Sequence, residues 1–168
     1  VVAQGEKRLK MVVAIDPENP KVDADRVQAV RKAIGDDVEL MIDANYLFSF
    51  NRALELCKLV EPYHITWFEE PVPPEDIAGY REVKSALAVP IAGGECEFTR
   101  LGFRDVLVAR AMDIIQPDTC AAGGLSECKK IADMAEAFGI RYNPHVWGTG
   151  IAIAASLPRG SPARCPGR

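Results

Sequence analysis

Three carboxylates stand at equal intervals in this sequence, each at the end of a short apolar run. They are Asp43, Glu69 and Glu95, and 26 residues separate each from the next. Such a run predicts a buried parallel strand, and a spacer of this length holds one helix and two loops. The three acids are therefore expected at the carboxyl ends of successive strands, where α/β folds place their chemistry.

Carboxylates that meet in one cleft repel each other unless a cation lies between them. Ligation by oxygen alone suits Mg²⁺, with Mn²⁺ as the other candidate. Any one of these acids can instead cap a helix or face solvent in a loop. The equal spacing of all three in one register favours a metal site.

A strand–helix rhythm continues along the whole chain. Strands are predicted over residues 9–15, 38–42, 65–68, 91–92, 112–115 and 140–143. Helices are predicted over residues 24–34, 51–60, 73–88, 101–109, 125–138 and 150–157. Asp23 and Thr99 are expected to cap the first and fourth helices. This alternation predicts an α/β protein with a parallel sheet.

Six βα units are more than a flavodoxin-like domain needs and fewer than the eight of a (β/α)₈ barrel. A doubly wound sheet is the rival architecture, but it concentrates ligand residues at one switch point. Polar residues close nearly every predicted strand here, which favours the barrel. We expect one domain over residues 1–157 and a disordered Pro-, Gly- and Arg-rich tail over 158–168.

Composition excludes several classes of function. The formal net charge of the 168-residue chain is −4. The sequence contains no long block of like charges, so it does not predict a nucleic-acid partner. No apolar run has membrane length and no signal peptide is recognised. Five cysteines without Cys-x-x-Cys spacing argue for a reducing cytoplasm and against disulfides or zinc. Burial is expected for these thiols, with Cys96 as the exception because it follows Glu95.

A histidine and an aspartate end two further strands. His145 lies before a glycine-bearing turn, and Asp118 ends the preceding strand, so neighbouring strands should bring the two side chains together. An Asp that holds one ring nitrogen raises the basicity of the other, which makes the pair a candidate general base. A lone histidine is more often structural, and His64, at the start of a strand, is interpreted that way. Lys10 and Asn45 also stand at strand ends.

The glycine pairs do not predict a nucleotide site. Gly93-Gly94 can relieve crowding beside Glu95, and Gly123-Gly124 opens a helix that is able to bind an anion. Neither fits the Gly-x-Gly-x-x-Gly pattern, and no Walker motif is present. A nucleotide-binding α/β domain is therefore the weakest of the functional hypotheses.

Taken together, these segments resemble the enolase superfamily, mandelate racemase/muconate lactonizing enzyme subgroup. The resemblance runs from about residue 5 to 157 and rests on these stretches: Leu40-Met41-Ile42-Asp43-Ala44-Asn45, Trp67-Phe68-Glu69-Glu70-Pro71, Gly93-Gly94-Glu95, Gln116-Pro117-Asp118 with Gly123-Gly124, and Pro144-His145-Val146-Trp147-Gly148-Thr149-Gly150. Within the subgroup, the stretch from residue 67 to 157 is most similar to D-galactarolactone cycloisomerases and sugar-acid dehydratases.

The resemblance implies a (β/α)₇β barrel and Mg²⁺ held by the three acids. It implies a His145–Asp118 dyad that removes the proton α to the carboxylate of a sugar acid or its lactone, which gives a metal-stabilised enediolate. Lys10 matches the residue beside the substrate carboxylate. Asn45 and Trp147, in the same segments, are assigned to substrate binding. Homo-oligomers are implied for the full-length form.

Two departures from the family pattern qualify this interpretation. The family's Lys-x-Lys motif supplies a second base, but here the segment is Lys10-Met11-Val12, so racemisation from both faces is not expected. Dehydration or cycloisomerisation from the His145 side remains. The capping domain, the first barrel unit and the last strand are not matched, which predicts a fragment with exposed edges. The alternative function is therefore a catalytically inactive remnant that keeps the fold as a binding or interaction module.

Overall fold

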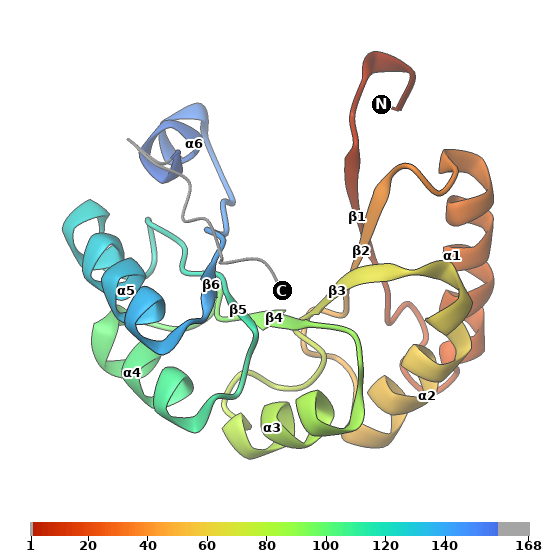
Figure 1. Cartoon of the computed structure of the whole chain (residues 1–168), viewed down its shortest axis with the longest axis horizontal. Helices are drawn as coiled ribbons and strands as arrows, with labels where there is room; N and C mark the ends of the chain where they lie inside the picture. The colour runs from red at the N-terminus through yellow and green to blue at the C-terminus, as the bar shows by residue number, and fades with distance from the viewer. Residues whose placement is uncertain (1, 158–168) are drawn as a thin grey trace. The chain divides into compact units, whose positions relative to one another are not determined.

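The computed structural model describes residues 2–157, and the predicted tail lies outside these described residues. The chain forms two compact units that divide between Ile91 and Ala92. Each unit contains strands and helices in alternation, as the sequence predicts (Figure 1). Among the described residues, no helix has both the length and the apolar character needed to cross a membrane.

The first unit is built on three parallel strands. After a short 3₁₀ turn, η1 (Val2–Gln4), come β1 (Arg8–Val12), β2 (Glu39–Asp43) and β3 (Ile65–Glu69). The strands pair in sequence order, and their register places Val12 beside Asp43 and Asp43 beside Glu69. Because neighbours in register on parallel strands point to the same face, this row aligns the side chains that end the three strands.

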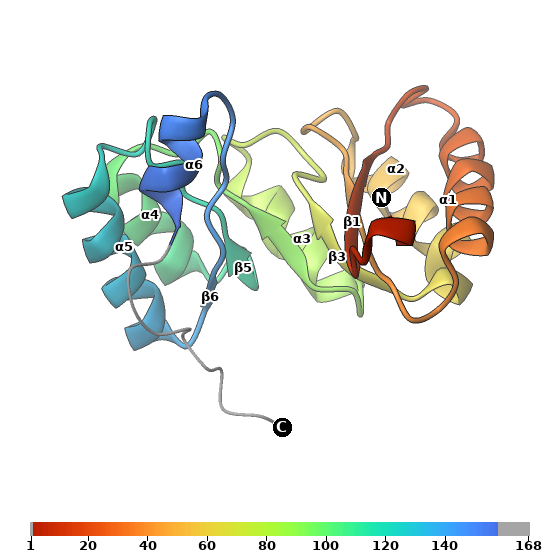
Figure 2. The same ribbon diagram turned by 90° about the horizontal axis from the view of Figure 1, so that it is seen from above.

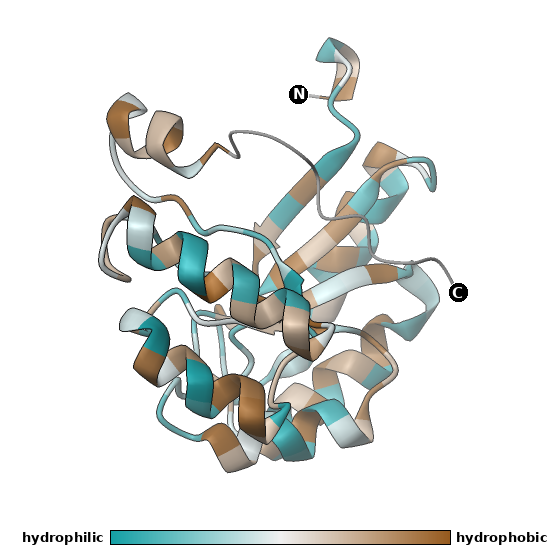
Figure 3. Ribbon diagram, turned by 60° about the vertical axis from the view of Figure 1, so that its left-hand side comes forward, coloured by the Kyte–Doolittle hydropathy of each residue, from teal (hydrophilic) through white to brown (hydrophobic). Residues whose placement is uncertain are grey.

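The helices of the first unit follow one another outside its strands (Figure 1). They are α1 (Pro20–Ile34), α2 (Phe50–Val60), the 3₁₀ turn η2 (Glu61–Tyr63) and α3 (Ile77–Ala86). Each helix buries one side, through residues such as Val27, Leu56 and Val83. Figure 3 shows the same mixture of hydrophobic and hydrophilic residues along the helices nearest the viewer. Strand residues such as Leu40, Ile42 and Phe68 are fully buried as well. Burial of this kind is the main stabilising contribution to such a unit.

The second unit repeats the pattern with shorter strands. It begins within β4 (Ile91–Gly93), whose first residue still belongs to the first unit. It continues with α4 (Thr99–Ala109), β5 (Ile114–Ile115), α5 (Leu125–Phe138), β6 (Arg141–Tyr142) and α6 (Gly150–Ser156). The strands β4, β5 and β6 pair in parallel, and α4 packs beside α5 (Figure 2). The hydroxyl of Ser156 donates to that of Thr119 over 3.1 Å, which ties α6 to the rest of the unit.

Two predicted helix starts are wrong. Asp23 does not cap α1: the helix begins at Pro20, whose fixed φ suits a first turn, and Asp23 is buried inside it with an ion pair to Arg26. The third helix does not begin at Pro73. It begins at Ile77, because the Asp76 side chain accepts a hydrogen bond from the N–H of Gly79 over 2.8 Å and caps it there.

The other boundaries differ by a few residues. Thr99 does not precede α4 as a cap: it is the first residue of the helix, and Phe98 is the N-cap. The hydroxyl of Thr99 accepts from the N–H of Leu101 over 3.3 Å within the first turn. The first, fifth and sixth strands are shorter than predicted, because apolar residues such as Val13, Ala14 and Met112 are buried in loops outside the paired strands.

Candidate active site

Lys10, Asp43 and Glu69 form a charged cluster at the strand ends of the first unit. The ammonium Nζ of Lys10 lies 2.8 Å from Oδ2 of Asp43 and also donates to Oε1 of Glu69. Both carboxylates are almost inaccessible to solvent, at 4% exposure for Asp43 and 1% for Glu69. Burial by itself lowers the pKa of Lys10, but the two carboxylates outweigh it and hold that pKa above its ordinary value.

Two further donors fix the orientation of these carboxylates. The backbone N–H of Asn45 donates to Oδ1 of Asp43 over 3.0 Å, and the indole N–H of Trp67 donates to Oε2 of Glu69 over 2.9 Å. Each of the four carboxylate oxygens therefore accepts at least one hydrogen bond. This is how a protein keeps two buried charges in a defined geometry.

The backbone near these strand ends is strained. Four residues other than glycine have left-handed φ values: Ala14 at 60°, Asn45 at 44°, Tyr46 at 57° and Glu70 at 43°. Each lies one to three residues beyond the end of β1, β2 or β3. Such conformations cost about 1–3 kcal/mol each and gather at functional sites, which supports a functional role for this end of the strands.

Glu69, the last residue of β3, and Glu70, which follows it, have separate environments. Glu69 faces Lys10 and Trp67, whereas Glu70 is fully buried and accepts a hydrogen bond from the hydroxyl of Tyr80 on α3. The Tyr80 contact joins Glu70 to α3, so Glu70 has a packing role. His64 precedes β3 at its amino end, as expected, and its carbonyl faces Arg31.

In the second unit, His145 lies between two carboxylates. Its Nδ1 atom is 2.7 Å from Oδ2 of Asp118, and its Nε2 atom is 3.1 Å from Oε2 of Glu95. Asp118 and His145 form a parallel bridge beyond β5 and β6, which is why residues 27 apart in sequence meet. Both carboxylates accept from this ring only when both nitrogens carry protons.

Asp118 receives several donors. Burial would raise its pKa, but the hydrogen bond with His145 and the N–H groups of Cys120 and Trp147 together hold that pKa below its ordinary value. The N–H of Cys120 lies 2.7 Å from Oδ1, and the N–H of Trp147 lies 3.3 Å from Oδ2. Asp118 is therefore ionised and fixed at neutral pH, as an orienting group for an imidazole must be.

A cavity of about 350 Å³ opens beside this histidine. It is lined by Glu95, Cys96, Asp118, Cys120, Ala121, His145 and Trp147. The side chain of Trp147 is 84% exposed, so it offers an aromatic surface to anything that enters. Cys96 is exposed as anticipated, but the expected burial of Cys120 is wrong, because its loop turns the thiol toward this cavity. Cys57 and Cys128 are buried as expected.

Gly94 shapes the approach to Glu95. Its φ is +106°, and a Cβ there would stand 2.9 Å from the ring of Phe103. Only glycine satisfies both conditions without a shift of the backbone. Of the Gly93-Gly94 pair, Gly94 is therefore the position where the backbone beside Glu95 requires glycine.

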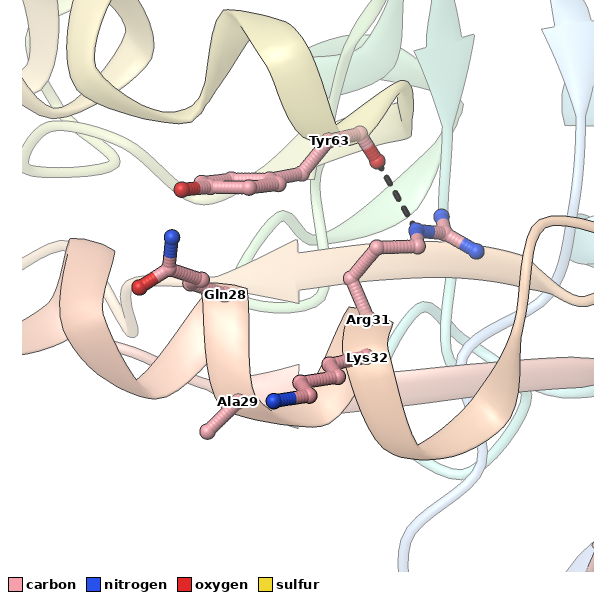
Figure 4. A pocket seen from close by; sticks show the side chains of 5 residues that line it. All are labelled: Gln28, Ala29, Arg31, Lys32 and Tyr63. Atoms are coloured by element: carbon pink, nitrogen blue, oxygen red, sulfur yellow. Dashed lines mark hydrogen bonds between the residues drawn. The ribbon is translucent and has the colours of Figure 1, made fainter.

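A second hollow lies in the first unit, between α1 and η2. It is lined by Gln28, Ala29, Arg31, Lys32 and Tyr63 (Figure 4). Its buried cation, Arg31, donates to the carbonyls of Tyr63, Gly35, Val38 and His64. Because these contacts commit the guanidinium to the backbone, we interpret this hollow as structural.

The chemistry of the donors suits a hard divalent cation. Asp43 and Glu69 are paired in register, offer only oxygen, and already surround one cationic group, the ammonium of Lys10. Glu95, the third predicted ligand, belongs to the second unit. Within residues 2–157, no group of three or more His, Cys, Asp or Glu side chains is arranged to hold a metal ion.

Sequence reasoning did not identify Trp67 and Tyr80 as partners of the two glutamates. The contact of Trp67 with Glu69 could have been predicted, because side chains two residues apart on one strand point to the same face. The contact of Tyr80 with Glu70 depends on how α3 packs, which no local pattern specifies.

Comparison with known proteins defines the class. The family model described as "Enolase C-terminal domain-like" matches residues 1–162. The chain is 48% identical over 131 residues to D-galactarolactone cycloisomerase of Agrobacterium fabrum, covering 78% of this chain and 35% of that protein. It is 36% identical over 156 residues to arabinonate dehydratase of Saccharolobus solfataricus, covering 93% of this chain and 41% of that protein.

The fold agrees with solved structures. The 3,6-anhydro-D-galactonate cycloisomerase from Zobellia galactanivorans matches with a TM-score of 0.89 and 45% identity, over 92% of this chain and 43% of that one. The predicted fold class, six βα units of an enolase-type barrel, is thereby confirmed. The chain belongs to the enolase superfamily, in its C-terminal domain-like family, and it spans less than half the length of these relatives.

Proposed function

We propose that this chain carries the catalytic groups of a divalent-cation-dependent lyase or isomerase. The reaction removes the proton α to the carboxylate of a sugar acid or its lactone, and continues as dehydration or cycloisomerisation. The observation that carries the proposal is the position of the His145 ring, 2.7 Å from Asp118 and 3.1 Å from Glu95 in one cavity. The names of the relatives, cycloisomerase and dehydratase, support the reaction class.

His145 is the group that moves the proton. Asp118 engages Nδ1, so Nε2 is the atom that accepts a proton from substrate or returns it. Nε2 now faces Oε2 of Glu95, and the substrate C–H reaches this nitrogen once Glu95 turns that oxygen to another partner. A fixed imidazole of this kind contributes about 10²–10⁴-fold to such a step.

Three carboxylates are proposed to hold the cation. Asp43 and Glu69 provide one pair of ligands and Glu95 the third, for Mg²⁺ or Mn²⁺. When bound, the cation supplies electrostatic stabilisation of the negative charge that develops on the substrate carboxylate. Lys10 adds a fixed positive charge beside Asp43 and Glu69 that can orient the same carboxylate.

Substrate contacts outside the charged groups are assigned to Asn45 and Trp147. Asn45 follows Asp43 in the strained turn after β2, and Trp147 presents its ring to the cavity of His145. The four described cysteines are all free, which fits a reducing compartment such as the cytoplasm.

Solvent exchange of the substrate α-proton tests the proposal. Purified chain with Mg²⁺ and D-galactonate or D-galactarolactone in D₂O should lose the α-proton signal in ¹H NMR spectra. His145→Asn should slow this loss at least 100-fold. His64→Asn is the matched control, because position 64 has a left-handed φ of 50°, which asparagine tolerates. Equal exchange in the wild type and in His145→Asn would remove His145 from the mechanism.

An inactive binding module is the second candidate. One observation favours it: Val12, at the position of the family's second base, stands in register with Asp43 and has no group that can carry a proton. The two candidates differ in turnover and in affinity for Mg²⁺. A remnant should bind Mg²⁺ weakly in calorimetry and exchange no α-proton.

A further inference from the structure

The orientation of Glu69 depends on a residue that stands outside the proposed ligand set. The carboxylate of Glu69 is 1% exposed, so water does not supply its hydrogen bonds freely. Its two oxygens face different donors: Oε1 faces the ammonium of Lys10, and Oε2 accepts from the indole of Trp67 over 2.9 Å.

Trp67 is well placed to act as a fixed donor. It is buried on β3, two residues before Glu69, so both side chains emerge on the same face of the strand. An indole ring packed in a core has little rotational freedom, and its single N–H has one direction. The hydrogen bond therefore prevents rotation of the Glu69 carboxylate about its last torsion, which is otherwise soft.

We propose that Trp67 is a positioning residue of the cation site, holding the Glu69 carboxylate so that Oε1 faces Lys10 and Asp43. The inference deepens the proposed function and rests on Glu69 being a ligand. A carboxylate oxygen has two lone pairs, so a donor on one of them leaves the other for a cation. Groups that orient a ligand in this way typically account for 10–100-fold in metal affinity.

The first arm of the test measures cation affinity. Mn²⁺ is titrated into the full chain, and free Mn²⁺ is counted by its electron paramagnetic resonance signal. Trp67→Phe keeps the aromatic volume and removes the N–H, and it should raise the dissociation constant for Mn²⁺ about 10-fold. Glu69→Gln should abolish binding at the same concentrations.

Tyr80→Phe is the matched control. It also removes one donor from a buried glutamate at the end of β3, but that glutamate is Glu70. Tyr80→Phe should lower the midpoint of thermal unfolding and leave the dissociation constant for Mn²⁺ unchanged. If both variants weaken Mn²⁺ binding equally, the effect is a general loss of packing and the proposal for Trp67 is overturned.

The second arm observes the hydrogen bond without any metal. The chain has two tryptophans, so ¹⁵N-labelled protein gives two indole N–H signals, and Trp67→Phe identifies one of them. Glu69→Gln should shift the Trp67 signal and leave that of Trp147 in place. Magnesium should also shift the Trp67 signal in the wild type.

The outcomes separate this inference from the proposed function. A wild-type chain that binds Mn²⁺ as tightly as Trp67→Phe does overturns the role of Trp67 alone. A Trp67 signal insensitive to Glu69→Gln does the same. A wild-type chain that binds no Mn²⁺, or a Glu69→Gln chain that still binds it, overturns the proposed function and this inference together.

Discussion

The carboxylate of Asp118 lies 2.7 Å from Nδ1 of His145, and its oxygens also accept two backbone N–H groups. This contact joins the loops that follow β5 and β6. The hydrogen bonds stabilise the ionised form of Asp118 and oppose the effect of burial, so its pKa lies below its ordinary value. One carboxylate therefore links folding stability to the proton transfer that we propose for His145.

The first prediction concerns acid stability. A carboxyl group whose pKa is lowered by folding contributes stability above its unfolded pKa and loses it as the pH falls through the folded pKa. Asp118→Asn should reduce the free energy of unfolding by about 1–2 kcal/mol at pH 7. The difference should shrink as the pH falls through the ordinary pKa of an aspartate, and it should vanish below the lowered pKa that Asp118 has in the folded chain. Urea unfolding at a series of pH values measures this, and a difference that stays constant with pH would contradict it.

The second prediction concerns Gly94. Gly94→Ala places a Cβ 2.9 Å from the ring of Phe103 at a φ of +106°, so the chain must shift beside Glu95. The free energy of unfolding, measured with urea, should fall by about 1–3 kcal/mol. Gly150→Ala is the control, because nothing lies within 4 Å of its added Cβ. Similar stabilities for the two variants would show that the loop accommodates the methyl group.

The third prediction concerns Arg31, whose guanidinium joins α1 to the loops around β2 and β3. It donates to the carbonyls of Val38 at 2.7 Å, Gly35 at 2.9 Å and Tyr63 at 3.0 Å. Lysine keeps the charge, but its one nitrogen cannot reach all of these carbonyls. Arg31→Lys should therefore lower the free energy of unfolding by about 2–4 kcal/mol. Arg52→Lys, at an exposed ion pair, should change the unfolding midpoint little.

The fourth prediction concerns the charge balance around Lys10. Lys10→Met leaves Asp43 and Glu69 buried without their ammonium, which should lower the free energy of unfolding by roughly 1–3 kcal/mol. Its side chain is 35% exposed, so the lower part of that range is expected. Because Mg²⁺ would replace the lost charge, its addition should raise the melting temperature more in Lys10→Met than in the wild type. If Lys10→Met has the same melting temperature in EDTA as in Mg²⁺, Asp43 and Glu69 bind no cation.

Most of the fold follows from the sequence because its signals are local. The apolar runs that end at Asp43 and Glu69 predict buried strands, and α5 ends at Phe138 before Gly139 as its pattern indicates. The errors occur where two local signals compete. Asp23 has the chemistry of a cap, but Pro20 starts the helix a turn earlier and Asp23 is buried against Arg26 instead.

Only two features of the site could be predicted from the sequence: the order of the strands and the alternating direction of side chains along each strand. They place Asp43 and Glu69 in one row and bring His145 to Asp118. They do not reveal that Lys10 bridges the acids, since this depends on the register of β1 against β2 and on side-chain conformation. The exposure of Cys120 depends likewise on a loop whose path no local pattern specifies.

The fifth prediction concerns the second base that position 12 lacks. Val12 is half exposed and stands in register with Asp43, so a longer side chain there would extend from the same row as the proposed ligands. Because proton transfer from both faces needs a group on each, the wild type should exchange the α-proton of only one epimer of the substrate. Val12→Lys should add exchange of the opposite epimer, and Val12→Met, of similar length without the amine, should not. Deuterium content in each epimer, followed by NMR, distinguishes the two, and exchange of both epimers by the wild type would show that a base other than residue 12 serves the second face.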